Sequence, residues 1–174
     1  MDIECMNYEK DDLRNRIRDF NCGNNELNKF LKEADLHCVT TKVFVESSSK
    51  KIIGFCSFCC SCVLTKSDTT IEKFPAIEIK IFAIDESYHG KEFTQYPHRN
   101  RRKNMTIADY VLRSMIIYFD ELSQNTISAK FIVLESTKKA MHFYSKNAFE
   151  CFPDTTSILR DEFGRGCVPM FRTI

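Results

Sequence analysis

The stretch that decides the fold runs from Phe74 to Met105 and reads FPAIEIKIFAIDESYHGKEFTQYPHRNRRKNM. Its first part alternates isoleucine with polar residues, which predicts a strand. The strand ends in a tight DESYHGK turn, where a glycine lets the backbone approach a phosphate closely. A phosphate cradle would carry a second glycine near Gly90, but Glu92 and Phe93 follow, and then a run rich in arginine. The stretch predicts a phosphate-binding turn that has been either rebuilt or lost.

The composition is that of an ordinary globular protein. The chain has 174 residues, 43% hydrophobic and 28% charged, which suits one domain with its own core. Its formal net charge of +1 argues against a general nucleic-acid binder, so any basic surface is local. The N-terminus is polar and acidic, and no apolar run approaches the roughly 20 residues that span a bilayer. We therefore expect a cytoplasmic protein without a membrane partner.

Four of the nine cysteines cluster in the sequence CSFCCSC. In a strand, Cys56, Cys60 and Cys62 share one face with Phe58, while Cys59 points to the other. Four thiolates arranged in this way cannot converge on one zinc ion, and no second ligand pair stands at finger-like spacing. We expect no metal site, and we interpret the cluster as small buried core residues.

The N-terminal part of the chain predicts a helix and a hairpin. Residues 23–38, GNNELNKFLKEADLHC, place apolar residues at helical spacing, with Asn24 or Asn25 as the cap. Residues 42–47 and 52–64 then predict two strands joined by a polar turn.

A second helix is predicted after the deciding stretch. Residues 65–75 are expected to form a loop, from which Pro75 opens the strand. Residues 106–122 predict a long helix, in which Thr106 and Asp109 form a capping box.

The C-terminal part predicts two more strands around a short helix. Residues 130–136 are expected to be a buried strand and residues 137–149 a short helix. Residues 156–161 and 167–174 are expected to pair as a closing antiparallel hairpin. The whole order predicts an α/β (α+β) domain, with one mixed sheet and helices on both of its faces.

Three local matches resemble the GNAT superfamily of acetyl-CoA-dependent N-acetyltransferases. Residues 79–91, IKIFAIDESYHGK, are similar to its central strand and pyrophosphate arm, and residues 136–152, STKKAMHFYSKNAFECF, to its small-residue, FY and GF signature. Residues 19–34, DFNCGNNELNKFLKEA, together with VPMF at 168–171, resemble the subgroup that includes tRNA-acetylating toxins of bacterial toxin–antitoxin modules. The resemblance covers the chain from about Phe20 to Phe171.

The resemblance implies a single GNAT domain over residues 1–174, with a mostly antiparallel sheet and a central V-shaped splay. Acetyl-CoA would lie in the splay, with its pantetheine paired to the strand as if it were an added strand. Backbone amides of the turn and of the next helix would hold the pyrophosphate. The residues implied at acetyl-CoA are Phe82, Ala83, Ile84, His89, Gly90, Lys91, Asn104, Ile107 and Ala108.

The resemblance also implies that Tyr144, the tyrosine of the FY pair, protonates the departing thiolate. By itself, a tyrosine beside Phe143 on a short helix is more often a core residue than a catalytic one. The general base stays open. Its candidates, Glu78, Lys80 and Glu135, are each also explained as polar residues on a half-exposed sheet face.

The chain departs from the family in the pyrophosphate arm. Ser87 or Tyr88 replaces the first polar residue of the family pattern, Gly90 remains, and Glu92 stands where the second glycine belongs. A glutamate there adds both a Cβ atom and a negative charge beside two phosphates. About a dozen residues are inserted before the helix, which we expect to begin at Thr106.

The inserted segment is basic, with Arg99, Arg101, Arg102 and Lys103 close together. A solvated loop, a contact with the phosphates of CoA and a contact with nucleic acid or another partner all stay open.

The function expected from the resemblance is transfer of acetyl from acetyl-CoA to a primary amine, with the α-amino group of an aminoacyl-tRNA as the toxin-like acceptor. The alternatives are a non-catalytic GNAT-fold binding protein with a degenerate arm, and an acetyltransferase for small amines or protein lysines. An antitoxin is the expected protein partner, and a homodimer stays open.

Overall fold

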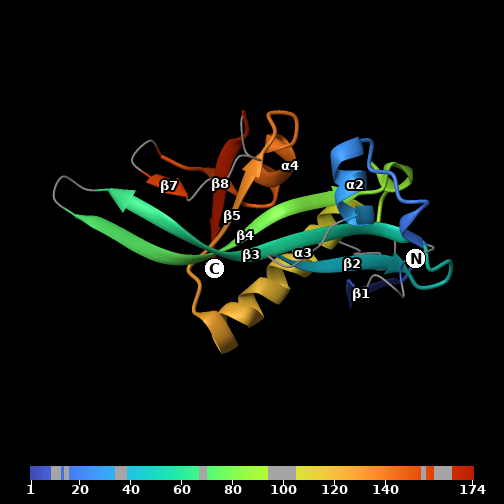
Figure 1. Cartoon of the computed structure of the whole chain (residues 1–174), viewed down its shortest axis with the longest axis horizontal. Helices are drawn as coiled ribbons and strands as arrows, with labels where there is room; N and C mark the ends of the chain where they lie inside the picture. The colour runs from blue at the N-terminus through green and yellow to red at the C-terminus, as the bar shows by residue number, and fades with distance from the viewer. Residues whose placement is uncertain are drawn as a thin grey trace. The chain divides into compact units, whose positions relative to one another are not determined.

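The structure, a computed structural model, describes residues 1–8, 13, 16–33, 39–66, 70–93, 105–153, 156–158 and 166–174 (Figure 1). Its longer elements, in chain order, are β1 (Ile3–Asn7), α2 (Asn25–Glu33), β2 (Thr40–Glu46), β3 (Ile52–Lys66), β4 (Ile71–Ile84), α3 (Ile107–Leu122), β5 (Phe131–Ser136), α4 (Met141–Lys146), β6 (Glu150–Cys151), β7 (Thr156–Ile158) and β8 (Val168–Thr173). A 3-10 turn, η1 (Glu86–Tyr88), follows β4, and a π-helical turn, η2 (Ser123–Ile127), follows α3. None of the described helices combines the length and apolar character needed to cross a membrane.

The strands form a mixed and mostly antiparallel sheet, as the sequence predicted. Their order is β1-β2-β3-β4-β5-β8-β6, and β7 pairs with β3. Strands β4 and β5 are parallel, whereas β1–β2, β5–β8, β6–β8 and β3–β7 are antiparallel. The chain divides into two compact units, Met1–Ser57 with Ile81–Ser114 and Phe58–Lys80 with Met115–Ile174, and β3, β4 and α3 each contribute residues to both.

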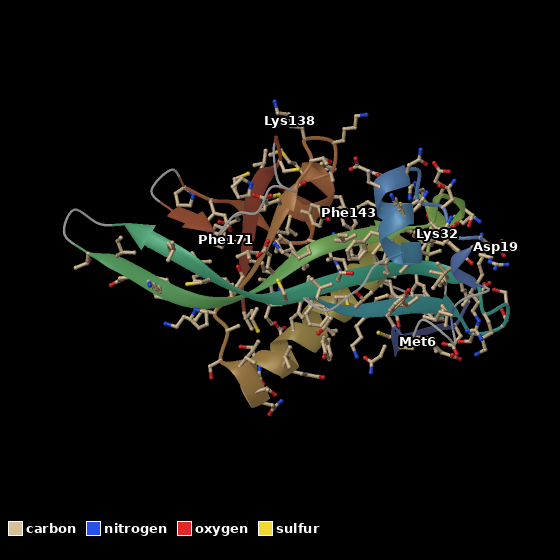
Figure 2. All side chains as sticks on the ribbon, in the orientation of Figure 1. Met6, Asp19, Lys32, Lys138, Phe143 and Phe171 are labelled. Atoms are coloured by element: carbon tan, nitrogen blue, oxygen red, sulfur yellow. The ribbon has the colours of Figure 1, made fainter. Side chains whose placement is uncertain are left out.

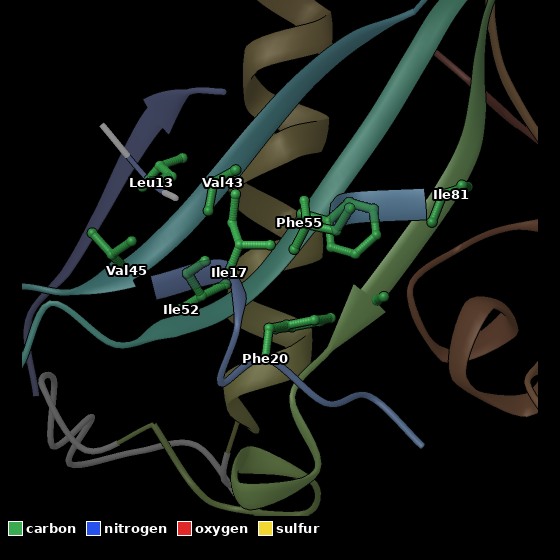
Figure 3. Packing of buried hydrophobic residues seen from close by; sticks show 10 residues of the cluster. Leu13, Ile17, Phe20, Val43, Val45, Ile52, Phe55 and Ile81 are labelled. Carbon is green, nitrogen blue, oxygen red and sulfur yellow. The ribbon is translucent and has the colours of Figure 1, made fainter. Parts of the chain in front are cut away.

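The first unit has its core between the N-terminal helical segments and strands β2, β3 and β4. Phe20 packs edge-on against Phe55 at 5.6 Å between ring centroids, and Phe30 stacks on Phe55 at 6.2 Å. Figure 3 shows this cluster on the face of β2 and β3 opposite α3. Burial of each large side chain stabilises the fold by about 1.5–3 kcal/mol. The cluster is formed by Leu13, Ile17, Phe20, Leu31, Val43, Val45, Ile52, Phe55, Ile81 and Ala83.

The helix caps follow the sequence prediction. The Asn24 side chain accepts hydrogen bonds from the N–H groups of Glu26 and Leu27, so Asn24 is the cap of α2. At the start of α3, Asp109 N–H donates to Thr106 Oγ1, and Thr106 N–H donates to Asp109 Oδ2. The capping box is therefore confirmed. Helix α2 is described to Glu33, and the remainder of the predicted helix lies outside the described residues.

The second unit is organised around β5, which lies between β4 and β8. Its aromatic residues include Phe131, whose ring lies 5.9 Å from those of Phe74 and Phe171 (Figure 2 labels Phe171 on β8). In the C-terminal half of α3, Phe119 is fully buried and its ring lies 4.8 Å from that of Phe58. These contacts secure β5 and its flanking strands in the unit that also carries α4.

The predicted loop at residues 65–75 was wrong at both ends. Strand β3 continues to Lys66, and β4 already begins at Ile71, so Pro75 lies within the strand. The carbonyl of Pro75 accepts from Lys130 N–H at 2.9 Å, just before β4 begins to pair with β5 at Ala76. The N–H and C=O of one strand residue point to the same edge, so the proline costs no hydrogen bond to β3.

The predicted C-terminal hairpin was also wrong. Strand β7 pairs with β3, from Val63↔Ile158 to Thr65↔Thr156, whereas β8 pairs with β5 along its whole length, from Phe131↔Thr173 to Ser136↔Val168. Pairing along the whole of the buried apolar strand β5 stabilises β8 more than a short pairing with its neighbour in sequence, β7, would.

The cysteine cluster is only partly a core feature. Cys56 is fully buried, and burial raises the pKa of its thiol well above the ordinary range. Cys60 is exposed, although the alternation of the strand places it on the same face, so the core interpretation was wrong for this residue. The ring of Phe119 on α3 covers Phe58, whereas Cys60, the next residue on that face of β3, is exposed to solvent.

Candidate functional site

Pairing between β4 and β5 stops before either strand ends. The parallel ladder runs from Ala76↔Phe131 to Ile79↔Leu134, while β4 continues to Ile84 and β5 to Ser136. This is the place where the sequence predicted the splay. A strand that extends beyond its last pair can accept an extended ligand through backbone hydrogen bonds.

The end of β4 carries three of the residues predicted to bind acetyl-CoA. Phe82 is partly buried, and Ala83 and Ile84 are buried at 5% and 6% exposure. The Ala83 carbonyl lies close to Gly54 of β3, where an added Cβ would stand only 2.5 Å from it. The backbone here is therefore set by close contact with the neighbouring strand.

A buried carboxylate shapes the turn that follows β4. Asp85 is 3% exposed and caps η1, because Oδ1 accepts from the N–H and hydroxyl of Ser87. Its Oδ2 accepts from Asn21 N–H at 3.0 Å, and Lys51 Nζ lies 3.3 Å from Oδ1. Burial alone raises the pKa of Asp85, but these hydrogen bonds outweigh it and lower the pKa.

Residues 21–25, NCGNN, pack against this turn through Asn21. Glu86 N–H donates to Asn21 O at 2.8 Å, and Asn21 Nδ2 donates to Glu86 Oε2 at 2.9 Å. Asn28 of α2 donates to Asn21 Oδ1 and accepts from Cys22 N–H. Sequence reasoning did not include Asn21, Asn28, Asp85 or Lys51 among the site residues. The pattern D-x-S after a strand could have indicated the cap of the turn.

Asp85→Asn is expected to lower the free energy of unfolding by about 1–2 kcal/mol near neutral pH, because the hydrogen bonds to a charged carboxylate are lost. The folded pKa of Asp85 is depressed, so its contribution is present above the unfolded pKa of about 4 and disappears as the pH falls through the folded value. Denaturant unfolding of wild type and variant between acid and neutral pH measures this. The difference in free energy of unfolding between wild type and Asp85→Asn should disappear in acid, where Asp85 is protonated.

The matched control is Asp120→Asn, which changes a partly exposed carboxylate on α3 outside this network. We expect a change within about 0.5 kcal/mol. A gap between wild type and Asp85→Asn that is equally large in acid would contradict the role of the carboxylate charge.

The predicted phosphate turn continues with three exposed residues. His89 Nε2 lies 2.8 Å from Ile84 O, and because a carbonyl only accepts, Nε2 carries the proton. Gly90 has φ +69°, a conformation that glycine adopts readily. Lys91 Nζ lies 5.5 Å from the centroid of the Tyr88 ring, and Lys51 Nζ lies 5.3 Å from it.

The insertion is closed at its base by a short bridge. Glu92 pairs with Thr106, Phe93 N–H donates to Met105 O at 2.8 Å, and Ile107 N–H donates to Lys91 O at 2.9 Å. Phe93 also stacks on Tyr110 of α3, with ring centroids 4.0 Å apart. The Ile107 amide, predicted to bind phosphate, is therefore used within the protein. Asn104 and the basic residues Arg99, Arg101, Arg102 and Lys103 lie outside the described residues.

Tyr144 lies on α4 in the second unit and is 8% exposed. Its ring packs edge-on against Phe143 at 5.1 Å and Phe149 at 5.8 Å (Figure 2 labels Phe143). The Tyr144 carbonyl accepts from the N–H groups of Asn147 and Phe149, which holds the C-terminal turn of α4 in place. The ring is thus positioned by packing, as a catalytic side chain requires.

Two of the candidate bases lie on one face of β4, as their alternation with isoleucine predicted. Glu78 and Lys80 bind each other, with Lys80 Nζ 2.9 Å from Glu78 Oε1, and Glu78 is 7% exposed. Glu135 is partly buried on β5 near Cys167. Burial raises the pKa of the Cys167 thiol, and the charge of Glu135 raises it further. Glu78 and Lys80 therefore act as one ion pair rather than as two separate candidates.

Comparison with known proteins locates this fold among solved toxins. No protein-family model and no curated protein matches the sequence. The structure of a bacterial toxin matches with a TM-score of 0.73 and 18% identity over 99% of this chain and 91% of that chain. AtaT complexed with acetyl-methionyl-tRNAfMet matches with a TM-score of 0.65 and 15% identity over 99% and 95%.

A further match is a tyrosine-to-phenylalanine variant of the toxin AtaT, bound to the C-terminus of the antitoxin AtaR and to acetyl-CoA. Its TM-score is 0.63 at 17% identity, over 99% of this chain and 94% of that chain. The sheet order, the interrupted β4–β5 ladder and these likenesses together show that the chain has the GNAT fold. Its structural neighbours include a bacterial toxin and the toxin AtaT solved with part of the antitoxin AtaR.

Proposed function

We propose that this chain is an N-acetyltransferase that moves the acetyl group of acetyl-CoA to the α-amino group of an aminoacyl-tRNA. The observation that carries the proposal is a fold likeness over 99% of the chain to a toxin solved with acetyl-methionyl-tRNAfMet. It is supported by the FY pair on α4 and by the ladder that ends at Ile79 and Leu134.

In the proposed reaction, the amine nitrogen attacks the thioester carbonyl carbon and the C–S bond then breaks. The Tyr144 hydroxyl gives its proton to the departing thiolate, and the new amide nitrogen loses one proton to solvent, from which Tyr144 is reprotonated. An α-amino group titrates near about pH 8, so a useful fraction arrives neutral and needs no dedicated base. This agrees with the engagement of Glu78 by Lys80.

An antitoxin is the proposed protein partner, since the toxins AtaT and KacT, whose structures this chain resembles, are solved with antitoxin present. The second candidate function is a GNAT-fold binding protein without catalysis. One observation favours it: Ile107 N–H, an amide predicted to bind the pyrophosphate of acetyl-CoA, donates instead to the carbonyl of Lys91.

The experiment is transfer of radiolabelled acetyl from acetyl-CoA to aminoacylated tRNA, with deacylated tRNA, free amino acid, spermidine and a lysine peptide as parallel acceptors. Label in aminoacyl-tRNA alone is the expected result. Label only in spermidine or the peptide would move the acceptor to small amines or lysines. No label in any acceptor, with no calorimetric binding of acetyl-CoA, would establish the non-catalytic reading instead.

A further inference from the structure

Helix α4 is short, and hydrogen bonds within its C-terminal turn hold it in shape. The Tyr144 carbonyl accepts from Asn147 N–H at 2.9 Å and from Phe149 N–H at 3.1 Å. Asn147 is 5% exposed, and its Nδ2 donates to the Phe143 carbonyl at 2.9 Å. A helix of six residues is not stable by itself, so the position of Tyr144 depends on what secures this turn.

Arg172 of β8 secures the turn from a strand of the same unit. Its Nη1 donates to the Asn147 carbonyl at 3.1 Å, while its backbone pairs with β5 opposite Ile132. An arginine that bonds to the last carbonyls of a helix satisfies acceptors that the helix itself leaves open. Two hydrogen bonds in series therefore connect β8 to α4: Arg172 to the Asn147 carbonyl, and Asn147 N–H to the Tyr144 carbonyl.

Two features of this turn and of its contact with β8 are energetically unfavourable. Ala148 has φ +65°, in the left-handed region, where an alanine is strained. Arg172 Nε is buried and has no hydrogen-bond partner among the described residues, so it loses its hydration without compensation. An apolar side chain on β8 would avoid the second cost. Such features cluster at functional sites, where they hold side chains in a required geometry.

We propose that Arg172 is a positioning residue for acetyl transfer: through the Asn147 carbonyl it fixes the last turn of α4 and keeps the Tyr144 hydroxyl in one place. This inference rests on the proposed function, in which that hydroxyl protonates the thiolate. Phe143 and Phe149 pack edge-on against the Tyr144 ring, whereas the bond from Arg172 restrains the helix that carries the ring. A displacement of about 1 Å at a reacting group can lower a rate about a hundredfold.

The test is a double-mutant cycle of Arg172→Met and Tyr144→Phe, read as kcat for acetyl transfer from acetyl-CoA to aminoacyl-tRNA. Methionine is a long unbranched side chain that cannot donate to the Asn147 carbonyl. We expect Arg172→Met alone to lower kcat about tenfold or more, with KM for both substrates within about threefold of wild type. In the Tyr144→Phe background it should change kcat by less than about twofold, because no hydroxyl remains to be positioned.

Two further variants serve as controls in the same assay. Arg172→Lys retains a cation that can donate to the same carbonyl, so its kcat should return to within about threefold of wild type. Lys73→Met removes the charge of an exposed lysine on β4 in the same unit and should leave kcat within about twofold. Equal falls of kcat for Arg172→Met in both backgrounds, or no fall in either, would overturn the inference.

Hydrogen exchange of the Asn147 and Phe149 amides, followed by NMR, separates this inference from the proposed function. Both amides donate to the Tyr144 carbonyl, so their exchange should quicken about tenfold or more in Arg172→Met if the arginine holds the turn. Unchanged exchange at both amides would overturn the inference even if kcat fell. If the wild type transfers acetyl to no acceptor, the proposed function fails, and the exchange rates still decide whether Arg172 holds the turn.

Discussion

Replacing Tyr144 with phenylalanine is expected to lower kcat about a hundredfold or more, with little change in acetyl-CoA affinity. The hydroxyl is needed only when the thiolate leaves, and a general acid contributes about 10²–10⁴-fold. The ring itself is retained, so its packing against Phe143 and Phe149 persists and the fold is kept. Steady-state kinetics with calorimetric binding separates the two effects.

The matched control for this variant is Tyr118→Phe, which removes a hydroxyl from a partly buried ring that packs against Phe58 in the same unit. We expect its kcat to stay within about twofold of wild type. Equal losses of turnover and donor affinity in Tyr144→Phe would show a binding role for the hydroxyl and remove the acid assignment.

Gly54→Ala is expected to destabilise the fold by about 2–3 kcal/mol, which is a large part of the stability of a domain of this size. The added Cβ would stand 2.5 Å from the Ala83 carbonyl and 2.6 Å from Ile84 Cδ1. One of these neighbours is backbone, so the strand itself must shift. Denaturant unfolding measures the loss.

Because Ala83 and Ile84 form the end of β4, the same substitution should also weaken donor binding in the folded fraction. Gly166→Ala is the control, since among the described residues its Cβ meets nothing within 4 Å, while its φ of +83° opposes alanine. That conformation costs about 1–2 kcal/mol. A smaller loss for Gly54→Ala than for Gly166→Ala would show that β3 and β4 adjust freely.

The sequence predicted correctly those features that depend on interactions between residues close together in the chain. The Asn24 cap and the Thr106–Asp109 box depend on residues within one helical turn, so their spacing alone predicts them. The alternation IEIKI identified β4, and the FY pair identified α4. The extra length of β4 was missed because Pro75 is a poor strand residue unless its N–H faces an edge without a partner.

The candidate site was only partly predictable, because some of its hydrogen bonds join residues that are far apart in the sequence. The sequence placed Gly90, Lys91 and Ile107 in one arm, and the positive φ of Gly90 agrees with a tight turn. It did not show that Lys91 O would take the Ile107 amide, because that bond joins residues across the insertion. Nor did it connect Asn21 with Asp85, which lie 64 positions apart.

The short strands β1 and β6 were not predicted from the sequence. The order of the other strands and helices, the helix caps, the tyrosine on α4 and Glu92 in place of a second glycine in the arm were predicted. These follow from propensity and spacing, which act over a few residues. Tertiary contacts decided which strands β7 and β8 join, and that the N–H groups of Asp85 and Glu86 donate to the carbonyls of Ile53 and Asn21. Each of these depends on which distant groups burial brings into contact, and burial is a property of the folded chain rather than of any one segment.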